Sequence, residues 1–172
     1  TKSEATYMKS KLIILRGNSG SGKSTIAKKL QHHFGHGTLL VSQDTVRRDM
    51  LNVKDRDGNR SIELIRQIAA YGKDRCEVVI VEGILYAERY GEMLRELIQT
   101  FNNKAYVFYF DLTFEETLRR HNSRAKKDEF GEESLRAWWN SNDVLSVENE
   151  MVFKDEQTED EVMNIIFERL EE

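Results

Sequence analysis

A glycine-rich stretch near the start of the chain constrains the fold more than any other feature. It fits the pattern G-x-x-x-x-G-K-S/T and reads Gly17-Asn18-Ser19-Gly20-Ser21-Gly22-Lys23-Ser24-Thr25. The glycines allow the backbone to curl so that several N–H groups face one point, and a following helix would direct its positive end to the same point. The stretch therefore predicts a loop that binds phosphate. Such a loop must follow a buried strand and precede a helix.

The flanking residues meet both requirements. Residues 12–15 form a wholly apolar run, as in a strand that is covered on both faces. After the loop, apolar residues recur at helical spacing at Ile26, Ala27, Leu30 and Phe34. In this context we expect Lys23 to reach the β- and γ-phosphates of a nucleotide and the Ser24 hydroxyl to hold Mg²⁺.

Length and composition limit the classes of protein that fit. The 172 residues have room for one domain, which we take as residues 1–172, and residues 1–8 are interpreted as a tag remnant or a short disordered extension. A net charge of −4 argues against a protein that holds nucleic acid through a broad basic face. The single cysteine fits a reducing compartment, and no apolar run reaches membrane-spanning length. We therefore expect a cytoplasmic protein without membrane contact.

Apolar runs of strand length alternate with helical patterns along the rest of the chain. The strand candidates are residues 39–42, 78–81 and 105–110, with a weaker one at 150–154. Capping boxes at residues 113–116 and 158–161 predict two helix starts. This alternation predicts right-handed βαβ crossovers and a parallel sheet with helices on both faces.

Ligands bind such sheets at the carboxyl ends of the strands, and Asp44 directly follows the second apolar run. Arg47 comes three residues later and would share a helix face with it. A carboxylate here can accept the proton of a substrate hydroxyl as it attacks the γ-phosphate, while the arginine orients the acceptor. The alternative is that Asp44 caps a helix and pairs with Arg47 or Arg48. Beside a phosphate cradle we favour the catalytic role.

Two further acids follow strand candidates. Glu82 ends the third apolar run, where proteins with this phosphate loop place an acid near the water shell of Mg²⁺. The alternative for Glu82 is a solvated carboxylate at a strand end. We interpret Asp111 as a turn residue ahead of the helix cap at Thr113.

A basic segment at residues 118–127 would attract phosphate. Arg120 and Arg124 lie four residues apart on one helix face, where like charges repel unless an anion lies between them. Arginines that fold over a transferring phosphoryl group stabilise its charge, so we predict a lid at residues 112–130. The alternative is a basic helix end that complements the helix dipole. We assign the following tryptophans, Trp138 and Trp139, to the core.

Together these residues resemble the P-loop kinases of nucleoside-monophosphate-kinase type, especially the kinase domains of polynucleotide 5′-hydroxyl kinases. The resemblance rests on residues 17–25, on the segment 43–47 with its Asp and Arg, and on residues 111–124 with the two lid arginines. Chloramphenicol phosphotransferase, gluconate kinase and the zeta-toxin kinases look similar too. The resemblance implies an α/β fold, namely a P-loop NTPase three-layer α/β/α sandwich with a five-stranded parallel sheet and a short helical lid.

The leading hypothesis is an ATP- and Mg²⁺-dependent phosphotransferase that acts on a hydroxyl of a small molecule or nucleoside. The alternatives are a polynucleotide 5′-hydroxyl kinase and an ATP-binding regulatory module with little transfer activity. The acceptor pocket would be walled by residues 50–60 and 130–142, whose polar turns suit a mobile loop but identify no ligand. The acceptor and the oligomeric state stay open at this stage.

Overall fold

The computed structural model describes residues 9–122, 131–140 and 142–171 and places five parallel strands in one sheet. The strand order is β2-β3-β1-β4-β5, so the first strand lies at the centre. The strands are β1 (Lys11–Gly17), β2 (Leu39–Ser42), β3 (Val78–Gly83), β4 (Ala105–Phe110) and β5 (Glu150–Phe153). The predicted five-stranded parallel sheet is confirmed.

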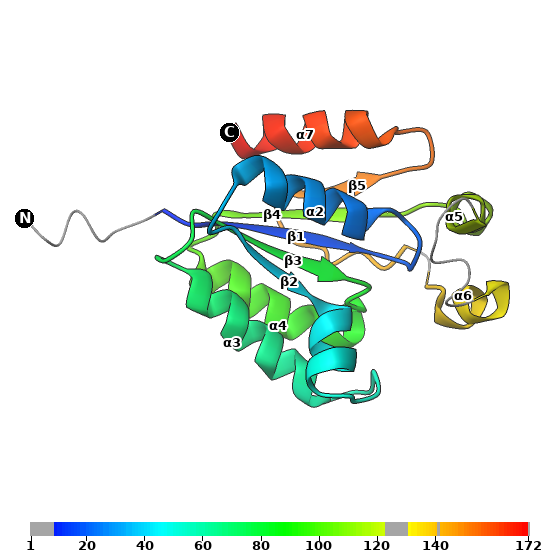
Figure 1. Cartoon of the computed structure of the whole chain (residues 1–172), viewed down its shortest axis with the longest axis horizontal. Helices are drawn as coiled ribbons and strands as arrows, with labels where there is room; N and C mark the ends of the chain where they lie inside the picture. The colour runs from blue at the N-terminus through cyan, green and yellow to red at the C-terminus, as the bar shows by residue number, and fades with distance from the viewer. Residues whose placement is uncertain (1–8, 123–130, 141, 172) are drawn as a thin grey trace, which may run out of the picture.

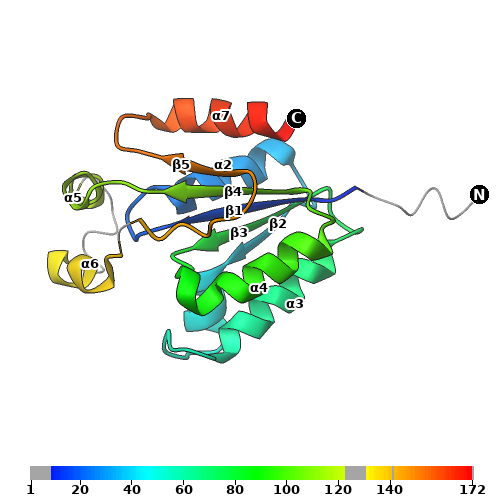
Figure 2. The same ribbon diagram turned by 180° about the vertical axis from the view of Figure 1, so that it is seen from behind.

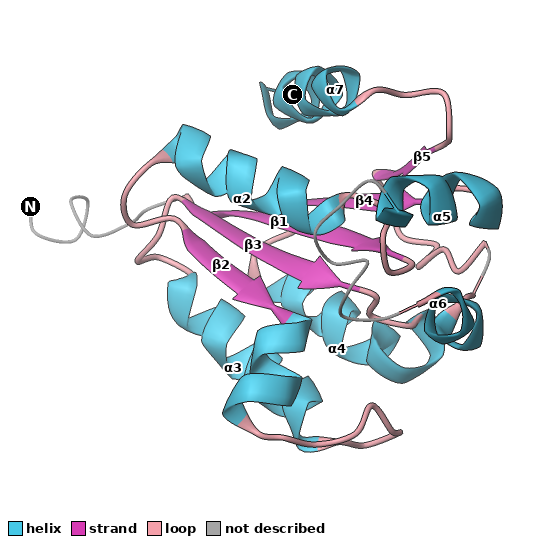
Figure 3. Cartoon of the chain, turned by 45° about the vertical axis from the view of Figure 1, so that its right-hand side comes forward, coloured by secondary structure: helices cyan, strands magenta, loops and turns pink. Residues whose placement is uncertain are grey.

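Helices cover both faces of the sheet. Helices α2 (Lys23–Phe34) and α7 (Glu159–Glu171) lie on one face, and α3 (Arg60–Gly72) and α4 (Ala87–Thr100) lie on the other (Figure 1). The view from behind shows the same three layers (Figure 2). The short π-helix η1 (Thr45–Met50), α5 (Phe114–Asn122) and α6 (Glu132–Trp138) lie at the end of the sheet to which the strands point (Figure 3). The three-layer α/β/α sandwich is thus confirmed.

The alternation of side chains along β1 explains why one apolar run supports two cores. Leu12 and Ile14 belong to the cluster beneath α3 and α4, whereas Ile13 and Leu15 belong to the cluster beneath α2 and α7. All four side chains are fully buried. A strand that is covered on both faces needs apolar residues at every position, as this one has.

The hydroxyl half of each predicted capping box forms. At Thr113 the reciprocal bond is replaced, because the Thr113 N–H donates to Asp155 Oδ1 at 2.8 Å and the Glu116 carboxylate bonds two arginines of its own helix. The Thr113 hydroxyl accepts a hydrogen bond from the backbone N–H of Glu116 at 3.1 Å, and the Thr158 hydroxyl accepts one from that of Glu161 at 3.2 Å. Each bond satisfies an N–H group that a helix start leaves without a partner. The first cap sets where α5 begins.

Two predicted features fall partly outside the described residues. These are residues 123–130 of the predicted lid, with Arg124, and the N-terminal residues 1–8. Within the described ranges, none of the helices combines the length and apolar character that a membrane crossing requires.

Candidate active site

The predicted phosphate cradle links the central strand to α2. Residues 17–22 form the loop, and Lys23, Ser24 and Thr25 make the first turn of the helix. A side chain at Gly17 would place its Cβ 2.8 Å from the backbone oxygen of Phe110, so only glycine fits there. Lys23 is buried, and its Nζ donates to the backbone oxygen of Asn18 at 3.1 Å. The lysine is therefore folded back over the loop that it is predicted to serve.

Ser24 and Glu82 meet beside this loop. The register of β1 with β3 sets Leu15 next to Glu82, which brings the acid to the start of α2. The Ser24 hydroxyl donates to Glu82 Oε2 at 3.2 Å, and Glu82 is buried. Hydroxyl and carboxylate oxygens are the hard ligands that Mg²⁺ prefers, and this ion takes few protein ligands because phosphates and water supply the rest. The pair therefore fits the predicted metal role.

No other metal centre competes with this pair in the described part of the chain. There, no group of three or more His, Cys, Asp or Glu side chains is placed to hold an ion. A site with one hydroxyl and one carboxylate suits an ion that arrives with a nucleotide.

Asp44 lies where β2 ends and η1 begins, with its side chain largely exposed. Its Oδ1 is 3.9 Å from Arg47 Nη2 and 3.9 Å from Arg48 Nε. Arg47 is mostly buried, and its Nη1 donates to the backbone oxygen of Val53 at 3.0 Å. Arg47 Nε, in contrast, has no hydrogen-bond partner in the described structure. Asp44 thus forms both predicted ion pairs, but at long distances, and its carboxylate stays exposed to solvent.

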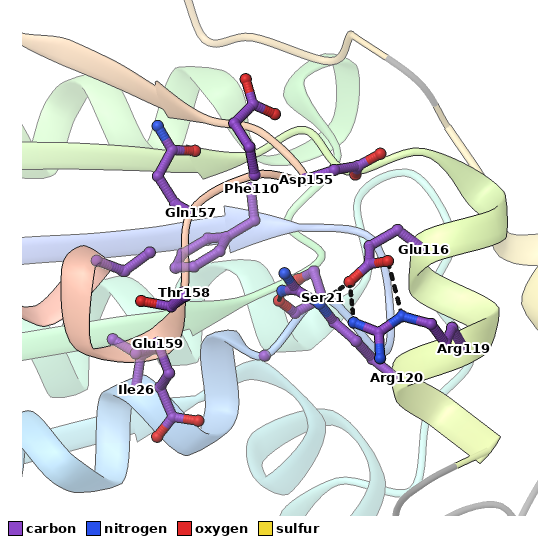
Figure 4. A pocket seen from close by; sticks show the side chains of 13 residues that line it. Ser21, Ile26, Phe110, Glu116, Arg119, Arg120, Asp155, Gln157, Thr158 and Glu159 are labelled. Carbon is purple, nitrogen blue, oxygen red and sulfur yellow. Dashed lines mark hydrogen bonds and ion pairs between the residues drawn. The ribbon is translucent and has the colours of Figure 1, made fainter.

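Arg120 of α5 reaches the phosphate loop. Its Nη1 donates to the backbone oxygen of Ser21 at 3.2 Å, and its Nε donates to Glu116 Oε1 at 2.9 Å (Figure 4). Arg119 bonds the same carboxylate, and these hydrogen bonds lower the pKa of Glu116 to about 2. Arg120 is therefore held by Glu116 and directed to the loop.

A cavity of about 410 Å³ opens beside the loop and was not predicted from the sequence (Figure 4). It is bounded by the loop, by α5 and by the connection from β5 to α7. Its lining includes Ser21, Gly22, Phe110, Arg119, Asp155 and Thr158. The capping box at Thr158 was the available signal, because it places a helix start at the same end of the sheet.

A buried arginine next to the loop was also missed. Arg16 is fully buried, and its guanidinium donates to the backbone oxygens of Leu85 and Asp143, each at 2.7 Å. It also pairs with Asp143 Oδ2 at 3.1 Å, and Glu150 lies 3.9 Å away. Burial lowers the pKa of Arg16, while the two carboxylates act in the opposite direction. The only signal was a charged residue directly after the apolar run at residues 12–15.

The chain that returns from α6 is tied to the loop by a second unpredicted contact. The Asn18 amide donates to the backbone oxygen of Asn140 at 2.6 Å and accepts from its N–H at 2.8 Å. The Tyr109 hydroxyl accepts from the backbone N–H of Asp143 at 2.8 Å and lies 3.4 Å from the Asn140 oxygen. Asn140 and Asp143 are thereby fixed against β4 and the loop.

One of two predicted minor roles fits the structure. Asp111 follows β4, pairs with Lys154 and accepts from the backbone N–H of Asn142 at 3.3 Å, as a turn residue would. Trp139, which was assigned to the core, is half-buried and belongs to neither core cluster of the described residues; its ring meets that of Phe114 of α5 edge-on at 5.3 Å. The Trp138 side chain lies outside the described part of the structure.

Known structures with this fold include several kinases. A gluconokinase from Sinorhizobium meliloti has a TM-score of 0.67 and 13% identity, with 95% of this chain and 93% of that chain covered. The APS kinase CysC from Mycobacterium tuberculosis, solved with AMPPNP and APS, has a TM-score of 0.66 and 16% identity, with 96% and 99% covered. A tunicamycin resistance protein from Deinococcus radiodurans has a TM-score of 0.64 and 15% identity, with 94% and 95% covered. The fold is therefore that of the P-loop NTPases.

The sequence itself matches none of the curated proteins. It does match the family model AAA_33, described as an AAA domain, over residues 12–143. That range includes the phosphate loop, Asp44, Glu82 and Arg120. Because the match spans most of the chain, the protein belongs to the AAA_33 family of AAA domains.

Proposed function

We propose that the protein is an ATP- and Mg²⁺-dependent phosphotransferase that moves the γ-phosphoryl group to a hydroxyl of a small molecule or nucleoside. One observation carries the proposal. Arg120 of α5 reaches the phosphate loop, while Asp44 presents an open carboxylate at the same edge of the sheet. A protein that only bound nucleotide would need neither an acceptor-side base nor an arginine over the loop.

On the donor side, the loop amides and Lys23 hold the triphosphate. Ser24 and Glu82 would hold Mg²⁺, which would supply charge neutralisation at the β- and γ-phosphates. The cavity between α5 and the β5–α7 connection takes the nucleotide base, because it opens beside the loop.

On the acceptor side, Asp44 accepts the proton of the attacking hydroxyl. The new bond joins the acceptor oxygen to the γ-phosphorus, and the bond to the β–γ bridging oxygen breaks, which releases ADP. Arg47 orients the acceptor, since its guanidinium lies beside Asp44, with Nη2 3.9 Å from Asp44 Oδ1. Arg120, with Arg124 by analogy of spacing, stabilises the charge of the phosphoryl group in transfer. Catalysis is then mainly positioning and charge neutralisation.

Two variants separate binding from transfer. Asp44→Asn should keep AMPPNP binding but lose about 10²- to 10⁴-fold in transfer rate, because the general base is gone. Lys23→Ala should lose both. Calorimetry with AMPPNP measures binding, and labelled ATP measures transfer. Full activity in Asp44→Asn would remove Asp44 from the mechanism.

The acceptor is found by a screen with labelled ATP against nucleosides, sugars, aminoglycosides, chloramphenicol and oligonucleotides. Labelling of an oligonucleotide with a steep salt dependence would favour the polynucleotide alternative, because phosphate contacts release counterions. Slow hydrolysis alone across the whole panel would favour an ATP-binding module. Labelling of one small hydroxyl compound is the expected outcome.

A further inference from the structure

We infer that Gln43 is a positioning residue, which fixes the proposed base Asp44 relative to the phosphate loop by holding the backbone of Leu85. The inference rests on the proposed function, because it concerns how the donor and acceptor halves of that site are aligned. Gln43 makes no contact with the loop itself among those described; it acts through Leu85.

The sheet aligns three residues in one row just before the site. The register of β1 with β3 pairs Arg16 with Gly83, and the register of β2 with β3 pairs Ser42 with Glu82. Gln43, the next residue along, therefore lies beside Gly83. Arg16 directly precedes the phosphate loop, and Gln43 directly precedes Asp44. The row thus underlies both halves of the site.

The two outer residues of this row, Arg16 and Gln43, both bond the backbone of Leu85. Its backbone N–H donates to Gln43 Oε1 at 3.0 Å. Its backbone oxygen accepts from Arg16 Nε at 3.2 Å and Nη2 at 2.7 Å. Each bond is buried, and together they satisfy both polar backbone groups of Leu85. The residues before the loop and before the base are thereby joined through a single peptide segment.

Leu85 is itself in a conformation that needs such support. Its φ is +45°, in the left-handed region that a residue with a side chain rarely adopts. Such backbone persists only when its surroundings hold it in place. Gln43 and Arg16 supply that hold at the end of β3, directly after Glu82 and Gly83.

The Gln43 side chain has little freedom to move away. It is almost fully buried, and a Cβ added to Gly83 would lie 2.4 Å from its Oε1. Asp44, in contrast, is exposed and has only ion pairs of 3.9 Å. The buried neighbour, rather than the base itself, therefore fixes the position of this backbone. Proton transfer is sensitive to such placement, because a shift of about 1 Å can cost about 10²-fold in rate.

The test uses the whole chain with Mg-ATP alone, so that water takes the place of the unidentified acceptor. Gln43→Met keeps the side-chain length and removes the acceptor oxygen. We expect the hydrolysis rate to fall about tenfold while the AMPPNP dissociation constant changes less than about twofold. Gln31→Met is the control, since the Gln31 side chain of α2 also bonds the backbone, here as a donor from Nε2 to the Thr38 oxygen at 3.1 Å, remote from Asp44. It should leave both values unchanged.

A second variant reaches the same bond from the other side. Gly83→Ala keeps Gln43 but displaces its side chain. If both changes break the same bond, the double variant Gln43→Met/Gly83→Ala should hydrolyse ATP about as fast as the slower of the two single variants. Additive losses would overturn the inference, because they would mean two independent defects. An unchanged hydrolysis rate in Gln43→Met would overturn it as well, provided that Asp44→Asn is slow. If Asp44→Asn hydrolyses ATP at the normal rate, the proposed base fails first and the inference fails with it.

Discussion

Tyr109 shows how one side chain can fix the end of a loop, here at Asn140 and Asp143. From the sequence, residues 130–142 were predicted only as a wall of the acceptor pocket. The Tyr109 hydroxyl lies between the backbone N–H of Asp143 and the backbone oxygen of Asn140. The ring also faces the Arg16 guanidinium, whose central carbon is 5.5 Å from the ring centre. A buried hydroxyl with these partners is costly to remove, because the groups it served are left unpaired.

Tyr109→Phe should lower the free energy of unfolding by about 1–3 kcal/mol at neutral pH, measured by urea denaturation. Burial raises the pKa of Tyr109 to about 12. Since the folded pKa lies above the unfolded value of about 10, the phenol contributes stability in full below pH 10. That contribution is lost as the pH rises from 10 towards 12. Tyr109→Phe should flatten this part of the stability curve, and an equally steep curve in the variant would contradict the assignment.

At the scale of elements, α5 is the part of the predicted lid that the structure describes. Glu116 holds Arg119 and Arg120, and Arg120 meets the loop at Ser21. The helix therefore sets an arginine against the phosphate loop.

Arg120→Ala should lower the transfer rate by about 10²-fold or more, because an arginine at the transferring group stabilises its charge. Initial rates with labelled ATP measure the effect. The control is Arg66→Ala on α3, where Arg66 pairs with Glu63 three residues away, as Arg119 does with Glu116. The control variant should keep the normal transfer rate. A normal transfer rate in Arg120→Ala would exclude Arg120 from the lid.

Local patterns predicted the elements well because they are set by neighbours in sequence. The strands at residues 39–42 and 105–110 have the predicted bounds, since apolar runs end there at polar residues. Thr113 marked the start of α5 through its capping box. Ser24 and Glu82 were placed together because carboxyl ends of parallel strands meet at one edge.

Such local patterns could not predict the contacts between segments that are distant in the sequence. Arg16 bonds Leu85, and Asn18 bonds Asn140, only because the sheet order brings those segments to the central strand. The wall at residues 50–60 was expected to suit a mobile loop. Instead Asp55 is tied to α4, through Arg89 at 3.2 Å and the Tyr90 hydroxyl at 2.7 Å. Composition alone shows polar residues but not the partners that fix them.

At the scale of the whole molecule, stability depends on two cores that share one sheet. Ile80 is fully buried in β3, which lies between β2 and β1, and packs into the cluster beneath α2 and α7. Removal of a buried methyl-rich side chain loses its transfer energy and leaves a cavity.

Ile80→Ala should therefore lower the free energy of unfolding by about 2–5 kcal/mol, measured by urea denaturation. Met50→Ala is the control, because Met50 is 55% exposed, and a change within about 0.5 kcal/mol is expected. Similar losses in both variants would mean that β3 does not carry the core.

The central position of β1 also governs when the site can form during synthesis. Gly17 packs against Phe110, and β1 is flanked by strands that begin at Val78 and Ala105. The chain up to Gly83, nearly half of its 172 residues, must leave the ribosome before the first strand gains one neighbour, and the chain up to Phe110 before it gains both. These long-range pairings are slow to close. The phosphate loop, although early in the sequence, thus acquires its shape late, and the proposed nucleotide is a ligand of the folded domain rather than of the nascent chain.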